Sequence, residues 1–290
     1  MNKNQITKST NQQINTILTI AGSDSGGGAG IQADIKTISA LGGFAASAIT
    51  AVTVQNTRGV SGICDIPHKI VAEQIEAVLS DFSVKAVKIG MINQADLVEV
   101  IASAVKKYAI ENVVLDPVMV ATSGDKLMQH ATIEKLKNEL FPLAAIITPN
   151  LYEAGILLNR KIATIEQMKT AAKELCVFGC KSALVKGGHL DKDDMTDILY
   201  LAEEDAFYTF SAGRIETKNL HGTGCTLSSA VAVFLAFGED IPQAVRLAKQ
   251  YLTSAIEAGK DIEIGTGNGP VNHFFNPLKL KMVKGGVDLK

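Results

Sequence analysis

Residues 16–30 read Thr16-Ile17-Leu18-Thr19-Ile20-Ala21-Gly22-Ser23-Asp24-Ser25-Gly26-Gly27-Gly28-Ala29-Gly30, an apolar run that ends in a glycine-rich loop. Apolar residues then recur at helical spacing, at Ile31, Ile35, Ile38 and Leu41. The stretch therefore predicts a strand, a glycine loop and a helix in that order. This unit is the building block of open α/β sheets.

The same alternation continues along the chain to about residue 258. Strands are expected at residues 44–52, 84–89, 112–116, 145–148 and 182–186, and helices at 68–81, 94–108, 132–140, 150–158 and 165–178. Three short segments, 198–201, 206–210 and 214–217, predict a small antiparallel edge before the last two helices. Continuously apolar runs such as Val113-Val114-Leu115 are typical of parallel strands covered on both faces. The fold class predicted is α/β, with a mostly parallel central sheet and helices on both faces.

The composition favours one cytoplasmic domain. No Pro/Ser-rich linker or repeat divides the chain, so residues 16–276 are expected to form one domain, with a disordered extension at 1–15 and a basic tail at 277–290. The 28 basic and 30 acidic residues form no basic stripe, which argues against a nucleic-acid partner. The first fifteen residues lack a signal-peptide core, and no apolar helix reaches the roughly 20 residues that span a membrane.

The four cysteines also fit a reducing compartment, because they are too few and too scattered for a disulfide framework. They are Cys64, Cys176, Cys180 and Cys225. The four-residue spacing of Cys176 and Cys180 is interpreted as packing, with no assigned chemistry. None of the cysteines has the spacing of a metal-binding pair.

The turn His221-Gly222-Thr223-Gly224-Cys225-Thr226 precedes an apolar helical segment at residues 227–237. A helix that starts in such a turn directs free N–H groups and the positive end of its dipole at an anion. Cys225 would then stand beside a bound phosphate and take the proton of an attacking hydroxyl, as in a kinase of small alcohols. The alternative is a plain helix cap with Cys225 as a small buried hydrophobe.

Other nucleotide motifs are missing or incomplete. Gly28, Gly30 and Ala33 fit only the loose form of a dinucleotide fingerprint, and no acidic residue lies between residues 44 and 60 to bind a ribose. No Gly-Lys-Ser or Gly-Lys-Thr occurs, so a P-loop is excluded. If a nucleotide binds, the turn at Gly222 must hold its phosphates.

Polar residues follow the predicted strands, where ligands of open α/β sheets bind. Asp116 and Glu153 are placed to hold Mg²⁺ between phosphates, and Lys186 to neutralise an anion. The structural alternatives are a turn at Asp116-Pro117, a capping box formed by Asn150 with Glu153, and a solvated Lys186. Gln55 carries a donor and an acceptor that suit a heterocycle with a ring nitrogen beside an amino group, or it satisfies loop backbone.

Taken together, these motifs resemble those of the hydroxymethylpyrimidine/phosphomethylpyrimidine kinases of the ribokinase-like superfamily, over residues 16–275. The matching stretches are Ala21-Gly22-Ser23-Asp24, Gly27-Gly28-Ala29-Gly30-Ile31-Gln32-Ala33-Asp34, Gln55-Asn56-Thr57, Lys88-Ile89-Gly90-Met91, Asp116-Pro117-Val118-Met119, Thr148-Pro149-Asn150 with Glu153, Lys186-Gly187-Gly188-His189, residues 221–226, and Gly269-Pro270-Val271 with His273.

The resemblance implies an enzyme of thiamin biosynthesis that phosphorylates 4-amino-5-hydroxymethyl-2-methylpyrimidine, and then its monophosphate, with ATP and Mg²⁺. Cys225 matches the catalytic base, in the turn with Gly222, Thr223 and Gly224. The substrate positions implied are Gln55, which reads the pyrimidine edge, and Asp34, Gly22, Ala29, Met91 and Val118. The nucleotide and phosphate positions implied are Asp116, Asn150, Lys186, Gly187 and His221, with Asp116 and Glu153 at the metal. A homodimer is also implied, because residues 52–67 are too few for a large lid.

One position departs from the family pattern. The family often has Asn-Thr-His before the anion turn, whereas this chain has Asn219-Leu220-His221, which removes a hydroxyl that could contact nucleotide. Two other functions remain open: a pyridoxal kinase of the same branch, and a ligand-binding relic of the fold without catalysis.

Overall fold

The computed structural model describes residues 12–119, 128–188 and 194–284 of the 290-residue chain. The strands are β1 (Gln12–Ile14), β2 (Thr16–Asp24), β3 (Phe44–Asn56), β4 (Gly59–Asp65), β5 (Val84–Ile89), β6 (Val113–Leu115), β7 (Ile146–Ile147), β8 (Ser182–Val185), β9 (Asp194–Leu201), β10 (Ala206–Gly213) and β11 (Met282–Lys284). The α-helices are α1 (Gly30–Ala40), α2 (His68–Leu79), α3 (Ala95–Lys107), α4 (His130–Lys135), α5 (Leu151–Leu158), α6 (Ile165–Cys176), α7 (Thr223–Ala236) and α8 (Ile241–Gly259).

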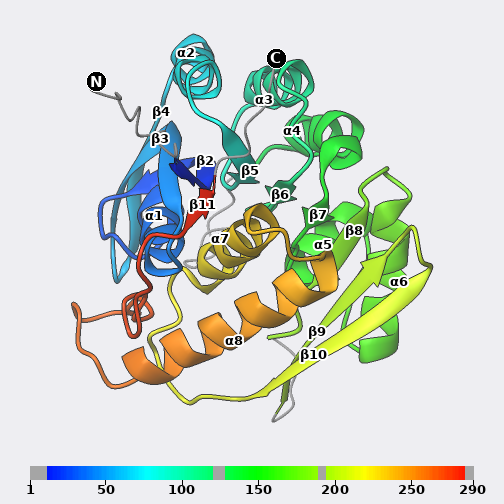
Figure 1. Ribbon diagram of the computed structural model, residues 1–290. Coiled ribbons are helices and arrows are strands. Elements are labelled where there is room, and N and C mark those ends of the chain that lie inside the picture. The colour runs from blue at the N-terminus through cyan, green and yellow to red at the C-terminus, as the bar shows by residue number, and fades with distance from the viewer. Residues whose placement is uncertain (1–11, 120–127, 189–193, 285–290) are drawn as a thin grey trace, which may run out of the picture.

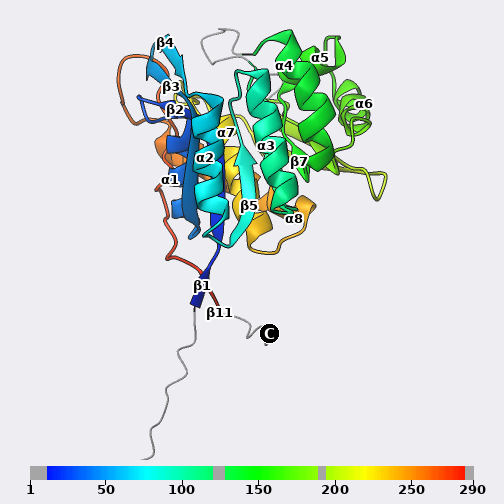
Figure 2. The ribbon, with the colours of Figure 1, turned by 90° about the horizontal axis from the view of Figure 1, so that it is seen from above.

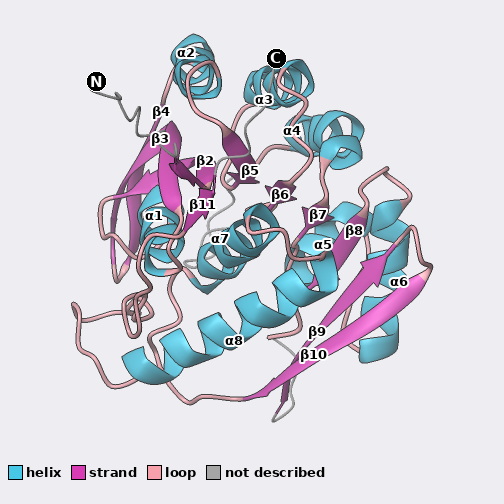
Figure 3. Cartoon of the chain, in the orientation of Figure 1, coloured by secondary structure: helices cyan, strands magenta, loops and turns pink. Residues whose placement is uncertain are grey.

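A nine-stranded sheet forms the centre of the molecule (Figures 1 and 3). Its order is β10-β9-β8-β7-β6-β5-β2-β3-β4, and the strands from β8 to β3 run parallel. The predicted α/β fold with a mostly parallel sheet is confirmed. Strands β6, β7 and β8 are buried along their whole length, as the continuous apolar runs predicted.

Each face of the sheet has its own core. On one face the apolar sides of α2, α3, α5 and α6 pack through residues such as Ile75, Ile101 and Leu175. On the other face α1, α7 and α8 pack through Ile38, Val231 and similar residues, and Figure 2 shows the helices flanking the sheet on its two sides. Among the described residues, no helix combines the length and the apolar character needed to cross a membrane.

The first strand, loop and helix form as predicted. Strand β2 is almost entirely buried, and the chain turns through the glycine loop into α1. Gly30 has a positive φ of 56°, and a Cβ there would collide with the carbonyl oxygen of Gly22. The glycine at this position lets the start of α1 approach the end of β2.

Both edges of the sheet are antiparallel. Strands β8, β9 and β10 form the antiparallel edge that the sequence predicted, but residues 214–217 do not form a strand. At the other edge β3 continues to Asn56 and pairs with β4 in a hairpin that the sequence analysis missed. Residues 59–65 are mostly exposed and contain Gly59 and Gly62, so they show no strong alternation of apolar and polar residues.

The two terminal strands pair with each other, with Gln12 opposite Lys284 and Ile14 opposite Met282. Residues 12–14 therefore belong to a strand and not to the disordered extension expected at 1–15, and the basic tail expected at 277–290 contributes the strand that pairs with them. Residues 1–11 and 285–290 lie outside the described residues.

Candidate active site

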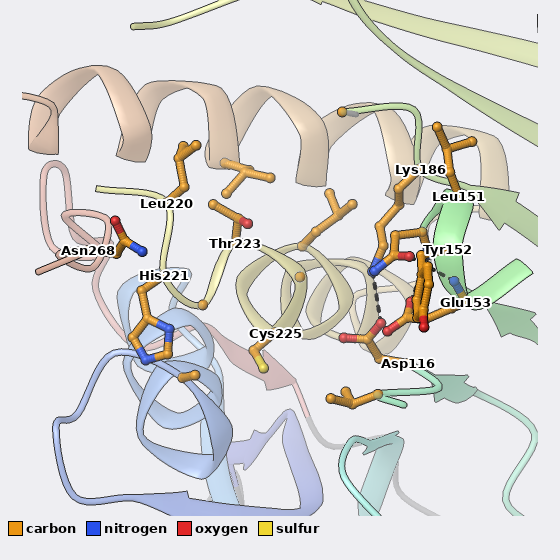
Figure 4. A pocket seen from close by; sticks show the side chains of 18 of the residues that line it. Asp116, Leu151, Tyr152, Glu153, Lys186, Leu220, His221, Thr223, Cys225 and Asn268 are labelled. Carbon is orange, nitrogen blue, oxygen red and sulfur yellow. Dashed lines mark hydrogen bonds and ion pairs between the residues drawn. The ribbon is translucent and has the colours of Figure 1, made fainter. Parts of the chain in front are cut away.

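A cavity of about 1320 Å³ lies at the carboxyl ends of the parallel strands. It is lined by fourteen of the residues singled out from the sequence: Gly22, Ala29, Gln55, Met91, Asp116, Val118, Asn150, Glu153, Lys186, His221, Gly222, Thr223, Gly224 and Cys225. Figure 4 shows this pocket, with His221 near one end and the group of Asp116, Glu153 and Lys186 at the other. The strand-end rule thus places side chains from distant parts of the sequence around one cavity.

The predicted anion turn is the start of α7. Gly222 is its N-cap in the left-handed region, with φ 80°. A Cβ at Gly222 would collide with the carbonyl oxygen of Gly28, so only glycine lets this turn pack on the first glycine loop. The N–H groups of Gly224 and Cys225 have no acceptor one turn earlier within the helix, and they point with the helix dipole toward the cavity.

Gly224 brings the anion turn against the charged end of the pocket. A Cβ added to it would lie 3.4 Å from Nζ of Lys186 and 3.5 Å from Oδ2 of Asp116. An anion in front of the turn would therefore also face the Lys186 ammonium. The turn and Lys186 together offer the N–H donors and the positive charge that a phosphoryl group requires.

Cys225 is the third residue of α7, and its side chain lines the cavity. In Figure 4 its sulfur lies between His221 and Asp116. Burial raises the pKa of this thiol to about 11. The Lys88 ammonium opposes that rise, as does a hydrogen bond from the backbone N–H of Gly30. The thiolate of Cys225 is therefore a strong base. It lies where the start of α1 meets the start of α7.

The charged end of the pocket is a buried pair. Nζ of Lys186 lies 2.9 Å from Oδ1 of Asp116, and Thr148 donates to the same oxygen at 3.1 Å. Burial raises the pKa of Asp116, but the charges of Lys186 and Lys88 outweigh it and lower the pKa. Burial likewise disfavours the Lys186 ammonium, but the charges of Asp116 and Glu153 outweigh it and raise the pKa. Both groups are therefore charged at neutral pH.

For Glu153 the sequence left two roles open, helix capping and Mg²⁺ binding, and the structure shows the first of them. Asn150 and Glu153 form a complete capping box at the start of α5, with Asn150 Oδ1 accepting from Glu153 N at 2.9 Å and Glu153 Oε2 accepting from Asn150 N at 2.8 Å. Burial raises the pKa of Glu153 to about 7, and the negative charge of Asp116 adds to that rise. A divalent cation between the two carboxylates would relieve their repulsion, so the residues fit Mg²⁺.

The described residues contain no cluster of three or more His, Cys, Asp or Glu side chains that could hold a metal by themselves. In phosphoryl-transfer sites Mg²⁺ is commonly held by one or two carboxylates, its own waters and substrate phosphates. A site built from Asp116 and Glu153 would therefore depend on the nucleotide to complete it.

Gln55 lies at the other end of the cavity, beside the two glycine loops. Its Oε1 is 2.9 Å from Oγ1 of Thr53, and its Nε2 is 3.4 Å from Nε2 of His221. Met91 packs against Gly22, where an added Cβ would meet the methionine sulfur at 3.7 Å. This end of the pocket offers one amide edge and small apolar walls, an arrangement suited to a flat heterocycle.

Two expected site residues do not line the cavity. Asp34 is 0% exposed, and its carboxylate is paired with Lys88 beneath the pocket. Gly187 donates its N–H to Oδ1 of Asp197 and packs against the backbone of Thr196, whereas its neighbour Gly188 does line the cavity. The expected direct contacts of Asp34 with substrate and of Gly187 with nucleotide do not fit this geometry. His189, quoted in the same motif, lies outside the described residues.

Two residues of the site were missed as site residues. Asp24 accepts hydrogen bonds from the N–H groups of Gly26, Gly28 and Ala29 and contacts His221. Lys88 is fully buried in β5 and lines the cavity. Both had a sequence signal: Asp24 is an acidic residue at the end of a buried strand, and Lys88 interrupts the apolar run Ala86-Val87-Lys88-Ile89.

Comparison with known proteins places this pocket among kinases. The family model described as phosphomethylpyrimidine kinase matches residues 24–272. A hydroxymethylpyrimidine/phosphomethylpyrimidine kinase of Rhizobium meliloti (strain 1021) is 51% identical over 258 residues, 89% of this chain and 96% of the relative. The crystal structure of phosphomethylpyrimidine kinase from Clostridium difficile 630 has a TM-score of 0.74 and 45% identity, covering 83% of this chain and 99% of that one. The Staphylococcus aureus pyridoxal kinase in complex with AMP-PCP and pyridoxal has a TM-score of 0.82 and 32% identity, covering 92% and 96%.

Proposed function

Because this chain belongs to the phosphomethylpyrimidine kinase family and is an ATP-dependent phosphotransferase, we propose that it phosphorylates the hydroxymethyl group of 4-amino-5-hydroxymethyl-2-methylpyrimidine and then the resulting monophosphate. The observation that carries this proposal is the position of Cys225 in the cavity, between His221, which the amide of Gln55 contacts, and the pair of Asp116 and Lys186. A pyrimidine held at Gln55 would direct its alcohol toward phosphates held at the other end.

The proposed chemistry is an in-line phosphoryl transfer. The substrate hydroxyl oxygen forms a bond to the γ-phosphorus of ATP, the bond from that phosphorus to the bridging oxygen of ADP breaks, and the hydroxyl proton passes to Sγ of Cys225. The amides of the first turn of α7 and the Lys186 ammonium compensate the negative charge on the transferred group. Positioning and charge compensation therefore do most of the catalysis, as expected for phosphoryl transfer.

We assign Mg²⁺ to Asp116 and Glu153. When bound, the ion would neutralise charge on the phosphates. Asp116 keeps its hydrogen bonds to Lys186 and Thr148 and so holds a fixed carboxylate at this place. Asn150 contributes to the nucleotide site by orienting Glu153 through the capping box.

Two further parts of the proposal concern the setting of the enzyme. A homodimer would cover the exposed apolar side chains of the β3–β4 hairpin, among them Val54 at 62% and Ile63 at 44% exposure. Light scattering of the purified protein tests this, and a monomer at assay concentration contradicts it. A cytoplasmic location fits the four cysteines, all of which are free thiols in the structure.

The deciding experiment is product analysis. The purified protein is incubated with the pyrimidine alcohol and MgATP, and mass spectrometry separates products that carry no, one or two phosphoryl groups. Two added groups support both proposed steps, and no added group rejects the substrate. Pyridoxal is the matched second substrate, because the similar Staphylococcus aureus structure holds pyridoxal. A higher kcat/KM for pyridoxal than for the pyrimidine would replace the proposed substrate by the alternative one.

A further inference from the structure

Beneath Cys225 lies a fully buried ion pair to which the proposed reaction gives no role. Nζ of Lys88 lies 2.8 Å from Oδ2 and 2.9 Å from Oδ1 of Asp34, and both side chains are 0% exposed. Moving two charges out of water is costly, and such a pair is often no more stabilising than apolar side chains of similar size. Stability is therefore a poor reason for a lysine at this point in β5.

The pair lies one helical turn below the reactive thiol. Ser229 follows Cys225 by four residues on α7, and Asp34 follows Gly30 by four residues on α1, so each pair shares one helix face. Oγ of Ser229 donates to Oδ1 of Asp34 at 2.7 Å. Helices α1 and α7 therefore contact each other at two levels. At their first turns the Gly30 N–H contacts the Cys225 sulfur, and one turn further along both helices Ser229 contacts Asp34.

The ion pair also has a defined direction. Asp34 is held away from the cavity, where Oγ1 of Thr19 donates to its Oδ2 at 2.6 Å, whereas Lys88 lines the cavity. The ammonium is enclosed on a third side by Gly90, where an added Cβ would lie 2.8 Å from Nζ. The positive end of the pair therefore lies on the side of the cavity, which Cys225 also lines, and the negative end lies toward the core.

We propose that Lys88, fixed by Asp34, is a positioning residue that stabilises the thiolate of Cys225, the form that accepts the substrate proton. This inference rests on the proposed function, in which Cys225 is the base. Lys88 acts through Cys225 and does not itself touch the reacting atoms.

The charges around the thiol support this role. Asp34 from α1 and Asp116 after β6 both raise the pKa of Cys225, and Lys88 from β5 lowers it. Lys186 also faces the thiol but is paired with Asp116. The effect of Lys88 on the thiol exceeds that of Asp34, in keeping with the direction of the pair. Without Lys88 the thiolate would lie in a buried site beside two carboxylates.

The test uses the ligand-free protein and needs no substrate. The rate of carbamidomethylation of Cys225 by iodoacetamide is followed by peptide mass spectrometry from pH 7 to 11.5, because the thiolate is the form that reacts. The variants are Asp34→Asn, which keeps the cation but removes its counter-charge, and the double variant Lys88→Met with Asp34→Asn, which removes both. Lys85→Met, an exposed lysine on the same strand, is the matched control.

The two variants are expected to move in opposite directions. In Asp34→Asn the rate of Cys225 alkylation at pH 8 is expected to rise about 10-fold, and the pH profile of that rate to level off at a lower pH than in wild type. The double variant is expected to react more slowly than wild type. The control Lys85→Met is expected to react like wild type. A change in accessibility would alter the rate but not the pH at which the profile levels off. If both variants level off where wild type does, the proposal is wrong. If the double variant does not fold, the Asp34→Asn profile decides.

The pH profile of kcat separates this inference from the proposed function. In a Cys225→Asp background the base is a carboxylate, and the added change Asp34→Asn is expected to leave the alkaline part of the profile unaltered. The alkylation experiment uses no substrate, so its result tests the role of Lys88 even if the enzyme prefers an alcohol other than the pyrimidine.

Discussion

Nε2 of His221 lies 2.8 Å from Oδ2 of Asp24, which joins the turn before α7 to the loop after β2 across 197 residues of sequence. Asp24 is 3% exposed, and its carboxylate also accepts hydrogen bonds from the backbone N–H groups of Gly26, Gly28 and Ala29. One carboxylate therefore joins two glycine-rich segments that line the cavity.

Replacing Asp24 by Ala leaves three N–H groups and the imidazole of His221 without their acceptor. The free energy of unfolding is expected to fall by about 3 kcal/mol, as for a buried charged acceptor with several donors. Urea denaturation measures it, and the exposed Asp81→Ala variant is the control. A loss below about 1 kcal/mol would contradict the role given to Asp24.

The same residue predicts a dependence of stability on pH. Burial raises the pKa of Asp24, but the hydrogen bonds from His221, Ala29 and Gly26 outweigh it, so the folded-state pKa lies below that of the unfolded chain. The stability that the carboxylate contributes is therefore present above about pH 4 and is lost as the pH falls through the lower folded-state pKa. The difference in stability between wild type and Asp24→Asn should shrink over that range, and a constant difference would contradict the pKa shift.

Removing the proposed base should affect turnover more than binding. Cys225→Ala is expected to lower kcat on the order of 100-fold with little change in the Kd of the pyrimidine. Because the pKa of the thiol is about 11, the wild-type rate should increase with pH through the alkaline range. Cys225→Asp should flatten that increase, since a carboxylate is already ionised. Full turnover of Cys225→Ala would remove the base from the mechanism.

If Glu153 holds Mg²⁺ as proposed, metal binding should depend on pH. Its pKa of about 7 lies above that of the unfolded chain, so its contribution to stability is present below about pH 4.5 and is lost as the pH rises through 7. Glu153→Gln should therefore make the metal-free protein more stable than wild type at pH 8, by about 3 kcal/mol at most. In nucleotide-bound wild type, Mg²⁺ affinity should rise with pH through 7, and the variant should lose that dependence. Calorimetric titration at pH 6 and 8 measures both.

Gln55 is expected to set substrate preference. Gln55→Ala removes one amide edge from the pocket and should raise KM for the pyrimidine about 10-fold, the effect of a single hydrogen bond of about 1.4 kcal/mol. Its effect on kcat should be smaller, because the amide lies beside His221, at the end of the pocket away from the proposed phosphate site at Asp116 and Lys186. An equal loss for pyridoxal and for the pyrimidine would show that Gln55 does not discriminate between them.

Much of the fold followed from the sequence because its signals are local. The glycine loop after a buried strand, the apolar runs of β6 and β8 and the turn before α7 each carry their conformation in neighbouring residues. Strand β4 was missed because its exposed residues acquire order only by pairing with β3. The pairing of β1 with β11 was missed for the same reason, since it joins the two ends of the chain.

In the candidate site, too, the features set by local sequence were predicted and those set by distant contacts were not. Residues directly after strands, such as Asp116 and Lys186, were placed correctly because parallel strands end at one edge. Asp34 was expected in the pocket, yet it faces Lys88 and Ser229. Its direction depends on how α1 rotates against α7 and β5, and helical periodicity alone does not fix that rotation.

The pairing of β1 with β11 turns the described chain into a nearly closed ring, with residue 12 beside residue 284. A short linker between these ends would span only the spacing of two paired strands, and new ends could be opened at the exposed Glu203-Glu204 turn between β9 and β10. The order of the elements along the polypeptide would change in such a circular permutant, whereas the cavity walls would keep every contact. The geometry of the pocket is thus independent of which residue begins the polypeptide.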